Sequence, residues 1–439
     1  MSMLQNFEKH IDNKLPFLRH SKILIAISGG IDSVVLTHLC HNIKLNIALA
    51  HCNFSLRDDE SDADEVFVVE LSEYLDVEVF AQRFNTKAYA EDNKRSIQMA
   101  ARELRYNWFS ELAEQLQFDC ILTAHHADDN LETFLINFTR GTGLDGLTGI
   151  PEINGKFVRP LLPFSSKDIQ HYAKENNIKW RDDSSNTSIK YLRNKLRHEV
   201  VPILKEINPS LLQSFHATLE NLNDTADIVE ESTYAVLKRA IVTMDENHVA
   251  FKISEFKKVN NPKAYLFAVF KDFGFTEWND VVDLLDAETG KLIWSNTHRL
   301  IKNREHLLLT AINNTNTDEV ILIAQSETSK ETPLGTLFLN ETDVVLEPNN
   351  TMIYVDKDKL KFPLVLRKKQ EGDVFYPIGM KGKKKLSKYF KDEKLSLLDK
   401  ENTWLLCSGD KIVWVVKRRA DERFKVSENT KNILKIKLS

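Results

Sequence analysis

The stretch "ILIAISGGIDSVVLTHL" (Ile23–Leu39) passes from an apolar, β-branched run into a helical pattern through a few small residues. An apolar run that ends at glycine is typical of a buried strand. Because Gly29 and Gly30 have no Cβ, a ligand can come close to the backbone N–H groups of this turn. The N-terminus of the following helix adds partial positive charge. The stretch therefore predicts a strand–turn–helix unit that holds phosphate groups.

An acidic residue, Asp32, lies at the end of this turn, and the lysine of a Walker A loop is missing. A carboxylate repels phosphates unless a cation joins them, so we expect Mg²⁺ to bridge Asp32 and phosphate oxygens. The alternative is an ordinary tight turn, in which Asp32 is only a favourable residue at the start of a helix.

Strand-like and helix-like segments alternate over the first two hundred residues. This alternation predicts an α/β fold with a doubly wound parallel sheet. Ligands of such sheets bind beyond the carboxyl ends of the strands, where the turn at Ser28 lies. The predicted strands are 23–28, 45–50, 77–81 and 119–123, and the predicted helices are 33–42, 62–74, 97–115 and 127–139.

The chain of 439 residues is long enough for two or three domains. We expect the α/β domain at 1–212, a helical middle domain at 213–312 and a small β-containing domain at 319–439, with the polar run 313–318 as a linker. The last part is basic, because residues 357–439 hold 23 lysines and arginines against 11 acidic residues. Such a charge excess indicates a polyanionic partner. The alternative is that the lysines only keep a small β domain soluble.

Composition excludes several other classes of protein. The N-terminus lacks the pattern of a secretory signal and no 18-residue apolar run occurs, so we expect a cytoplasmic protein that does not associate with membranes. The four cysteines are scattered, without CxxC spacing, which argues against zinc sites, iron–sulfur clusters and a disulfide framework.

Three carboxylates lie in the first turns of the predicted helix 127–139: Asp128, Asp129 and Glu132. They could simply complement the helix dipole. Since the glycine turn lacks a lysine, we instead interpret them as ligands for Mg²⁺ and for a positively charged group of a substrate.

Two pairs of arginines have helical spacing. Arg193 and Arg197 lie four residues apart and should project from one face, where they fit the phosphates of a nucleotide or of a nucleic acid, unless this is only a solvated face. Arg102 and Arg105 form a second pair, for which partial burial against the sheet is the alternative.

The tail combines a lysine cluster with aromatic residues, a composition that suits RNA, although the aromatic side chains could also pack in a core. The lysines are Lys381, Lys383, Lys384, Lys385 and Lys388, and the aromatics are Tyr376, Tyr389 and Phe390.

SGGIDS after a strand resembles the PP-loop of the ATP pyrophosphatases, which have the adenine nucleotide alpha hydrolase-like fold. Three further stretches, "AHCNFSLRDDES" (50–61), "TAHHADDNLETFLINFTRGTGLDGLTGI" (123–150) and "RPLL…WRDDSSNTSIKYLRNKLRHEVVPIL" (159–204), narrow the resemblance to the tRNA(Ile)-lysidine synthase family. In the first of these, Arg57 and Ser61 match the family, whereas Phe54 stands where a second histidine is expected, so no role is assigned to it.

The resemblance implies a ligase that adenylates the wobble cytidine of the CAU-anticodon isoleucine tRNA with ATP and then joins the ε-amine of L-lysine to C2. The product, lysidine, changes codon recognition from AUG to AUA. The middle and C-terminal domains would bind the tRNA. The oligomeric state stays open, with a homodimer as one option.

The residues carried over from the family fall into three groups. The ATP-binding residues would be Ser28, Gly29, Gly30, Ile31, Asp32, Ser33 and Arg197; the catalytic residues Asp32, Asp129, Glu132 and Arg193, with Glu132 positioning or activating the amine; and the Mg²⁺ ligand Asp32. Two alternatives are a tRNA thiolase of the same superfamily, which the scattered cysteines fit poorly, and a non-catalytic RNA-binding protein regulated by a nucleotide.

Overall fold

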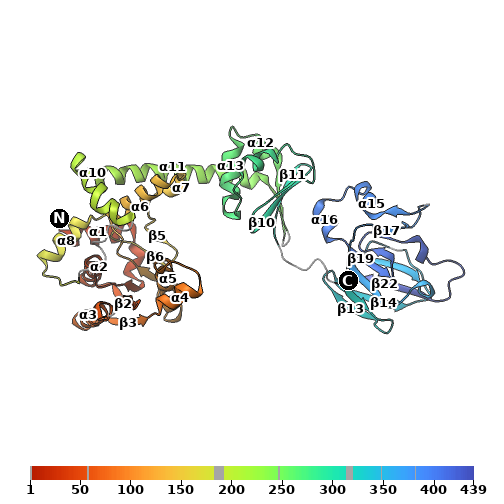
Figure 1. Cartoon of the computed structure of the whole chain (residues 1–439), viewed down its shortest axis with the longest axis horizontal. Coiled ribbons are helices and arrows are strands. Elements are labelled where there is room, and N and C mark those ends of the chain that lie inside the picture. The colour runs from red at the N-terminus through yellow and green to blue at the C-terminus, as the bar shows by residue number, and fades with distance from the viewer. Residues whose placement is uncertain are drawn as a thin grey trace. The chain divides into compact units, whose positions relative to one another are not determined.

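The computed structural model describes residues 2–56, 59–181, 192–245, 248–312, 320–347, 349–380 and 382–439 (Figure 1). Arg57, Lys381 and the predicted linker 313–318 therefore lie outside the described residues. The chain divides into two compact units, 1–230 and 231–439. Every helix in the described ranges is too short or too polar to traverse a lipid bilayer.

A six-stranded sheet with the order β3-β2-β1-β4-β6-β5 forms the centre of the first unit. All neighbours are parallel except the edge strand β5, which pairs antiparallel with β6. The predicted parallel sheet is confirmed. Its strands are β1 (Lys22–Ala26), β2 (Asn46–Asn53), β3 (Glu78–Arg83), β4 (Cys120–Leu122), β5 (Ile153–Asn154) and β6 (Phe157–Val158).

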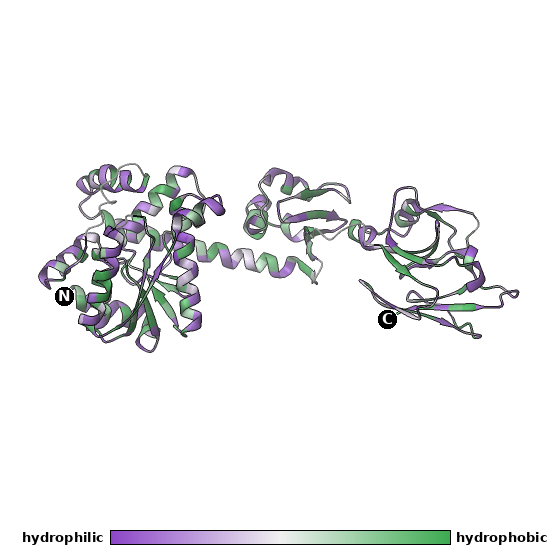
Figure 2. Ribbon diagram, turned by 60° about the horizontal axis from the view of Figure 1, so that its bottom comes forward, coloured by the Kyte–Doolittle hydropathy of each residue, from purple (hydrophilic) through white to green (hydrophobic). Residues whose placement is uncertain are grey.

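Helices cover both faces of this sheet, as a doubly wound fold requires. Because successive strand residues point to opposite faces, Ile23 and Ile25 pack on one side and Leu24 on the other. Figure 2 shows hydrophobic residues concentrated along these strands. The first face is covered by α1 (Met3–Lys14), α2 (Ile31–Asn42), α3 (Asp59–Leu75) and α8 (Ser166–Glu175), and the second by α5 (Ile97–Gln115).

The strand order reverses between β1 and β4, and crevices for ligands form at such points. The turn into α2 follows β1, and α6 (Ala127–Arg140) follows β4, so both helices begin at this crevice. The unit also contains η1 (Pro16–Arg19), α4 (Thr86–Asp92), α7 (Leu144–Leu147), α9 (Leu192–Lys195), a π-helical segment (Leu196–Val200) and α10 (Val201–Ile207). The division between the units falls within α11 (Leu211–Ala240).

The prediction of a helical middle domain at 213–312 is wrong in part, because the region also contains a β-sheet. Helices α12 (Ile253–Lys257), α13 (Pro262–Phe270) and α14 (Trp278–Asp283) are present, but they pack on a five-stranded antiparallel sheet with the order β7-β8-β11-β10-β9. Runs of three to six residues are too short for their period to separate strand from helix. The strands are β7 (Ile241–Met244), β8 (Val249–Lys252), β9 (Leu292–Trp294), β10 (His298–Asn303) and β11 (His306–Ala311).

The C-terminal part is β-rich, as predicted. Two sheets, β12-β16-β19-β20-β21 and β13-β14-β22-β15, enclose one hydrophobic core, and β17 pairs with β18. The helices are α15 (Leu386–Asp392) and α16 (Leu397–Asn402). The strands are β12 (Ile321–Ile323), β13 (Ser329–Thr332), β14 (Gly335–Glu341), β15 (Met352–Asp356), β16 (Leu364–Lys368), β17 (Val374–Phe375), β18 (Lys384–Lys385), β19 (Trp404–Ser408), β20 (Lys411–Val415), β21 (Arg419–Ala420) and β22 (Ile433–Leu438).

Contacts inside the second unit join its middle and C-terminal parts. Arg299 on β10 forms an ion pair with Glu401 on α16 at 2.6 Å. Leu397 and Leu398 pack against Ile301 and its neighbours in the middle sheet. The predicted domain boundaries at 212 and 319 stay a prediction.

Candidate active site

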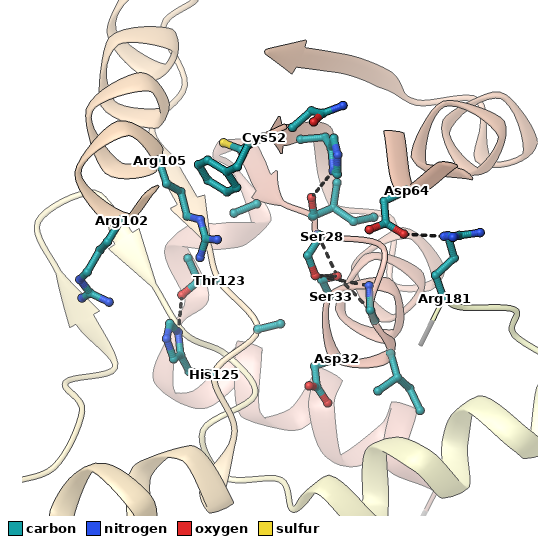
Figure 3. A pocket seen from close by; sticks show the side chains of 18 of the residues that line it. Ser28, Asp32, Ser33, Cys52, Asp64, Arg102, Arg105, Thr123, His125 and Arg181 are labelled. Atoms are coloured by element: carbon teal, nitrogen blue, oxygen red, sulfur yellow. Dashed lines mark hydrogen bonds and ion pairs between the residues drawn. The ribbon is translucent and has the colours of Figure 1, made fainter. Parts of the chain in front are cut away.

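The turn between β1 and α2 is folded by its own serines. Gly29 has φ +89°, a conformation that residues with a side chain rarely adopt. The Ser28 N–H donates to Ser33 Oγ at 3.1 Å, and Ser33 Oγ donates to the Gly30 carbonyl at 3.0 Å. The N-terminus of α2 therefore opens onto a cavity of about 500 Å³, which Ser28, Gly30, Ile31, Asp32 and Ser33 help to line (Figure 3).

The polar wall of this cavity combines basic and acidic side chains from several elements. It contains Arg102 and Arg105 from α5, Arg181, Arg193 and Arg197, together with Asp32, Asp64 and Asp129. Since all of these lie beside the strand reversal, the structure places the charged side chains where a doubly wound sheet binds its ligands.

Asp32 is the acidic residue with the fewest partners in this cavity. Its Oδ2 lies 3.7 Å from His126 Nε2, while its Oδ1 is buried without a hydrogen-bond partner in the described part of the chain. Burial raises the pKa of Asp32, and Asp129 and Asp128 raise it further, against the opposing effects of His126 and Arg197. A buried carboxylate oxygen without a partner is available to a cation.

Mg²⁺ fits this position. Among the described residues, no group of three or more His, Cys, Asp or Glu side chains could hold a metal ion by itself. Mg²⁺ does not need such a group, because proteins usually bind it through one or two carboxylates together with substrate phosphates and water. Asp32, at the edge of the turn predicted to bind phosphates, offers such a ligand.

The raised pKa leads to a prediction about stability. We expect Asp32→Asn to increase the free energy of unfolding at pH 7, because it removes a charge that the folded state disfavours. The pKa of Asp32 is higher in the folded state than in the unfolded state. The ionised carboxylate therefore lowers the free energy of unfolding of the parent at pH values above the folded-state pKa, and this loss disappears once the pH falls below the unfolded-state pKa. Urea unfolding of both proteins between pH 7 and pH 3 measures the difference; a variant less stable than the parent at pH 7 would contradict the argument.

The start of α6 is fixed by a reciprocal cap. The His126 N–H donates to Asp129 Oδ2 at 3.1 Å, and the Asp129 N–H donates to His126 Nδ1 at 3.4 Å. His126 Nε2 then lies 3.4 Å from Asp129 Oδ2 and 3.7 Å from Asp32 Oδ2, so one imidazole lies between the two carboxylates. Burial alone would raise the pKa of Asp129, but His126, Arg193, His125 and Arg197 hold it below its usual range.

Glu132 is buried beneath the predicted arginine pair. Its side chain is 1% exposed, and its two oxygens accept hydrogen bonds from Arg193 Nε at 2.9 Å and Arg197 Nε at 2.6 Å. Arg197 also bonds to Asp129 Oδ1 at 2.9 Å. Arg193, Arg197 and Asp129 line the cavity, whereas Glu132 is not part of its wall. In this geometry Glu132 positions the two arginines.

The third carboxylate, Asp128, faces away from the cavity. Its oxygens bind Lys205 on α10 and accept from the Ser166 N–H at the start of α8, the latter at 2.8 Å. Its role is to tie three helices together.

Sequence reasoning assigned no role to two histidines of the wall. Burial lowers the pKa of His125 to about 4, and Arg159, Arg193 and Arg102 add to the effect, so its ring is neutral at pH 7. Its Nδ1 lies 3.0 Å from Thr123 Oγ1. His51 Nδ1 donates to the Ile27 carbonyl at 3.0 Å, so its ring is held beside the end of β1.

An ion pair beside the turn also went unpredicted. Arg181 Nε lies 2.5 Å from Asp64 Oδ1, and the Arg181 N–H donates to the Gly29 carbonyl at 3.0 Å (Figure 3). In the sequence, Arg181 could be singled out only as part of the WRDD stretch that resembles the family.

In the tail, the predicted aromatic residues and lysines differ in their exposure to solvent. Tyr389 and Phe390 are buried in a core cluster, so they pack and do not stack on bases. Lys383, Lys385 and Lys388 are exposed, whereas Lys384 is half-buried and pairs with Asp392 at 2.7 Å.

Three family models match the chain: a PP-loop domain over residues 3–204, a TilS substrate binding domain over 244–312 and a TilS substrate C-terminal domain over 364–438. The tRNA(Ile)-lysidine synthase of Parabacteroides distasonis is 40% identical over 437 residues, which is 98% of this chain and 99% of the relative. The chain belongs to the tRNA(Ile)-lysidine synthase family.

A second member of the family supports the same conclusion. The synthase of Bacteroides thetaiotaomicron is 37% identical, covering 99% of both chains. A solved U34-tRNA thiolase from Methanococcus maripaludis aligns with TM-score 0.42 and 18% identity over 50% of this chain and 78% of that chain. The predicted resemblance is confirmed, and the PP-loop domain supports the use of ATP.

Proposed function

We propose that this protein joins the ε-amine of L-lysine to C2 of the wobble cytidine in an isoleucine tRNA with a CAU anticodon. The product is lysidine, which reads AUA in place of AUG. One structural observation carries the proposal: the phosphate-binding turn and the cluster of Asp129, Arg193 and Arg197 face the same cavity. ATP and an amine would therefore meet the base in one place.

In the first step, the C2 oxygen of cytidine attacks the α-phosphorus of ATP. A new O–P bond forms, the bond to the β-phosphate bridge breaks, and pyrophosphate leaves with the electron pair. The backbone N–H groups of the turn and the N-terminus of α2 bind the phosphates. Arg197 adds a charge that Glu132 and Asp129 hold in place. When bound, Mg²⁺ supplies further charge neutralisation beside Asp32.

In the second step, the ε-amine of lysine attacks C2. A C–N bond forms between the amine and C2, the bond from C2 to the adenylyl oxygen breaks, AMP leaves with the electron pair, and the amine loses a proton to water. Asp129 lies in the wall and is ionised, so it can bind an ammonium group of lysine. We assign that role to Asp129 and a positioning role to Glu132.

The two alternative functions, a tRNA thiolase and a non-catalytic RNA-binding protein, receive less support. Burial raises the pKa of Cys52 in the cavity wall to about 12, so it carries little thiolate for sulfur transfer. Cys40, Cys120 and Cys407 are buried in hydrophobic clusters. A non-catalytic protein that only binds a nucleotide would need Asp32 for Mg²⁺, but it would not need the carboxylate of Asp129 in the cavity wall.

The direct test is incubation with ATP, Mg²⁺, labelled lysine and a tRNA transcript with a CAU anticodon. We expect lysine incorporation that requires ATP and is lost when the wobble cytidine is replaced by uridine. Incorporation into both transcripts, or into neither, would overturn the proposal.

Further parts of the proposal concern partners and location. We infer that the middle and C-terminal regions bind the tRNA, and that the protein acts in the cytoplasm. A homodimer stays a prediction.

The exposed tail lysines give a prediction for tRNA binding. We expect the triple variant Lys383→Gln, Lys385→Gln and Lys388→Gln to flatten the plot of log affinity against log salt by about 2–3 units of slope, because fewer counterions are released on binding. ATP affinity should not change.

The matched control neutralises three other exposed lysines of the same region, Lys411, Lys417 and Lys431. Filter binding at several salt concentrations provides the measurement. If both triple variants change the slope equally, general charge and not the predicted cluster binds the tRNA.

A further inference from the structure

Two arginines of the cavity wall have no role in the chemistry described above. Arg181 pairs with Asp64, and Arg193 and Arg197 pair with Glu132. Across the described residues, Arg102 and Arg105 form ring contacts but neither an ion pair nor a hydrogen bond to a carboxylate. Their charges are therefore left for a ligand.

Arg105 is held by stacking. Its guanidinium lies 5.1 Å from the centre of the Phe54 ring, on α5's side of the cavity. Phe54 in turn stacks on Phe84 at 5.9 Å with an interplanar angle of 23°, and Phe84 contacts Trp108 edge-on at 6.1 Å. This column orients the guanidinium without using any of its N–H donors.

Arg102 repeats the arrangement three residues earlier on α5. Its guanidinium lies 4.8 Å from the centre of the Tyr106 ring, which also lines the cavity. Residues three apart on a helix share a face, so both guanidiniums come from one side. Figure 3 shows them on the helix across the cavity from Ser28 and Ser33.

We propose, building on the proposed function, that Arg102 and Arg105 bind RNA phosphates beside the target cytidine. Guanidiniums with free N–H donors bind phosphate oxygens in pairs of hydrogen bonds. The other phosphates of the reaction belong to ATP, and the turn at Ser28 lies on the opposite wall. Because the base must reach the α-phosphate of ATP, the RNA strand enters from the α5 side.

The test compares Arg102→Gln/Arg105→Gln with Lys87→Gln, an exposed lysine on α4 outside the cavity wall. The probes are the CAU transcript at several salt concentrations, and ATP alone. We expect the double variant to bind the transcript at least tenfold more weakly, with a salt slope smaller by about 1–2 because two phosphate contacts are lost. ATP affinity should stay within twofold of the parent.

A second variant distinguishes the effect of the charge of Arg105 from the effect of its orientation by Phe54. Phe54→Leu keeps an apolar side chain but removes the ring beneath Arg105, so transcript affinity should fall while the salt slope stays that of the parent. If the double variant loses ATP affinity instead, the arginines bind the nucleotide; if it binds both probes like the parent, they bind neither. Either result overturns this inference. Failure of the parent to incorporate lysine would count against the proposed function alone.

Discussion

Asp32→Ala should reduce tRNA-dependent pyrophosphate release by at least a hundredfold. Asp32 lies at the phosphate-binding turn with a buried oxygen that has no partner among the described residues. Removing a group that stabilises charge on the leaving pyrophosphate should cost more than about 2.7 kcal/mol, which is two powers of ten in rate. The measurement is pyrophosphate release with saturating ATP, Mg²⁺ and transcript.

Asp59→Ala is the matched control, since Asp59 is an exposed acidic residue in the first turn of α3 and does not line the cavity. It should retain the parent's rate. Thermal unfolding should show that Asp32→Ala is folded and no less stable than the parent. A variant within tenfold of the parent's rate would remove Asp32 from the catalytic site.

Glu132→Gln should lower stability and impair both chemical steps. Among the described residues, the substitution leaves Arg193 and Arg197 with only the Asp129 carboxylate between them. Breaking a buried ion pair costs several kcal/mol, but both guanidiniums are about one-third exposed or more, so we expect a loss of about 2 kcal/mol. Displaced arginines would then weaken ATP binding as well as amine transfer.

The sequence suggested another result for this variant. If Glu132 acted directly on the amine, Glu132→Gln would keep its stability, and adenylated tRNA would accumulate in the presence of lysine. Trapping the intermediate with labelled ATP, together with urea unfolding, distinguishes the two outcomes. The double variant Glu132→Gln/Arg193→Gln removes one charge of each sign, so it should recover part of the lost stability if the positioning role is right.

Much of the fold of the first unit could be predicted from the sequence, because it depends on residues that are neighbours in the chain. Glycine at positive φ, a β-branched run before it and a helix after it involve neighbours in the chain, so the turn at Gly29 and the strand–helix alternation could be predicted. The pattern failed where segments were short, as in the middle sheet from Ile241 to Ala311. There, the side-chain packing of paired strands, including the distant pair β8 and β11, decides the structure.

The tertiary structure alone decided what the charged side chains do. Three acidic residues within five positions of α6 look alike in sequence, yet Asp128 binds α8 and α10, Asp129 faces the cavity, and Glu132 holds two arginines more than sixty residues away. Helical spacing fixes the direction in which each side chain projects, but not which distant element lies there. The partner and the degree of burial set the charge and the accessibility of a carboxylate, and both come from the packing of the fold.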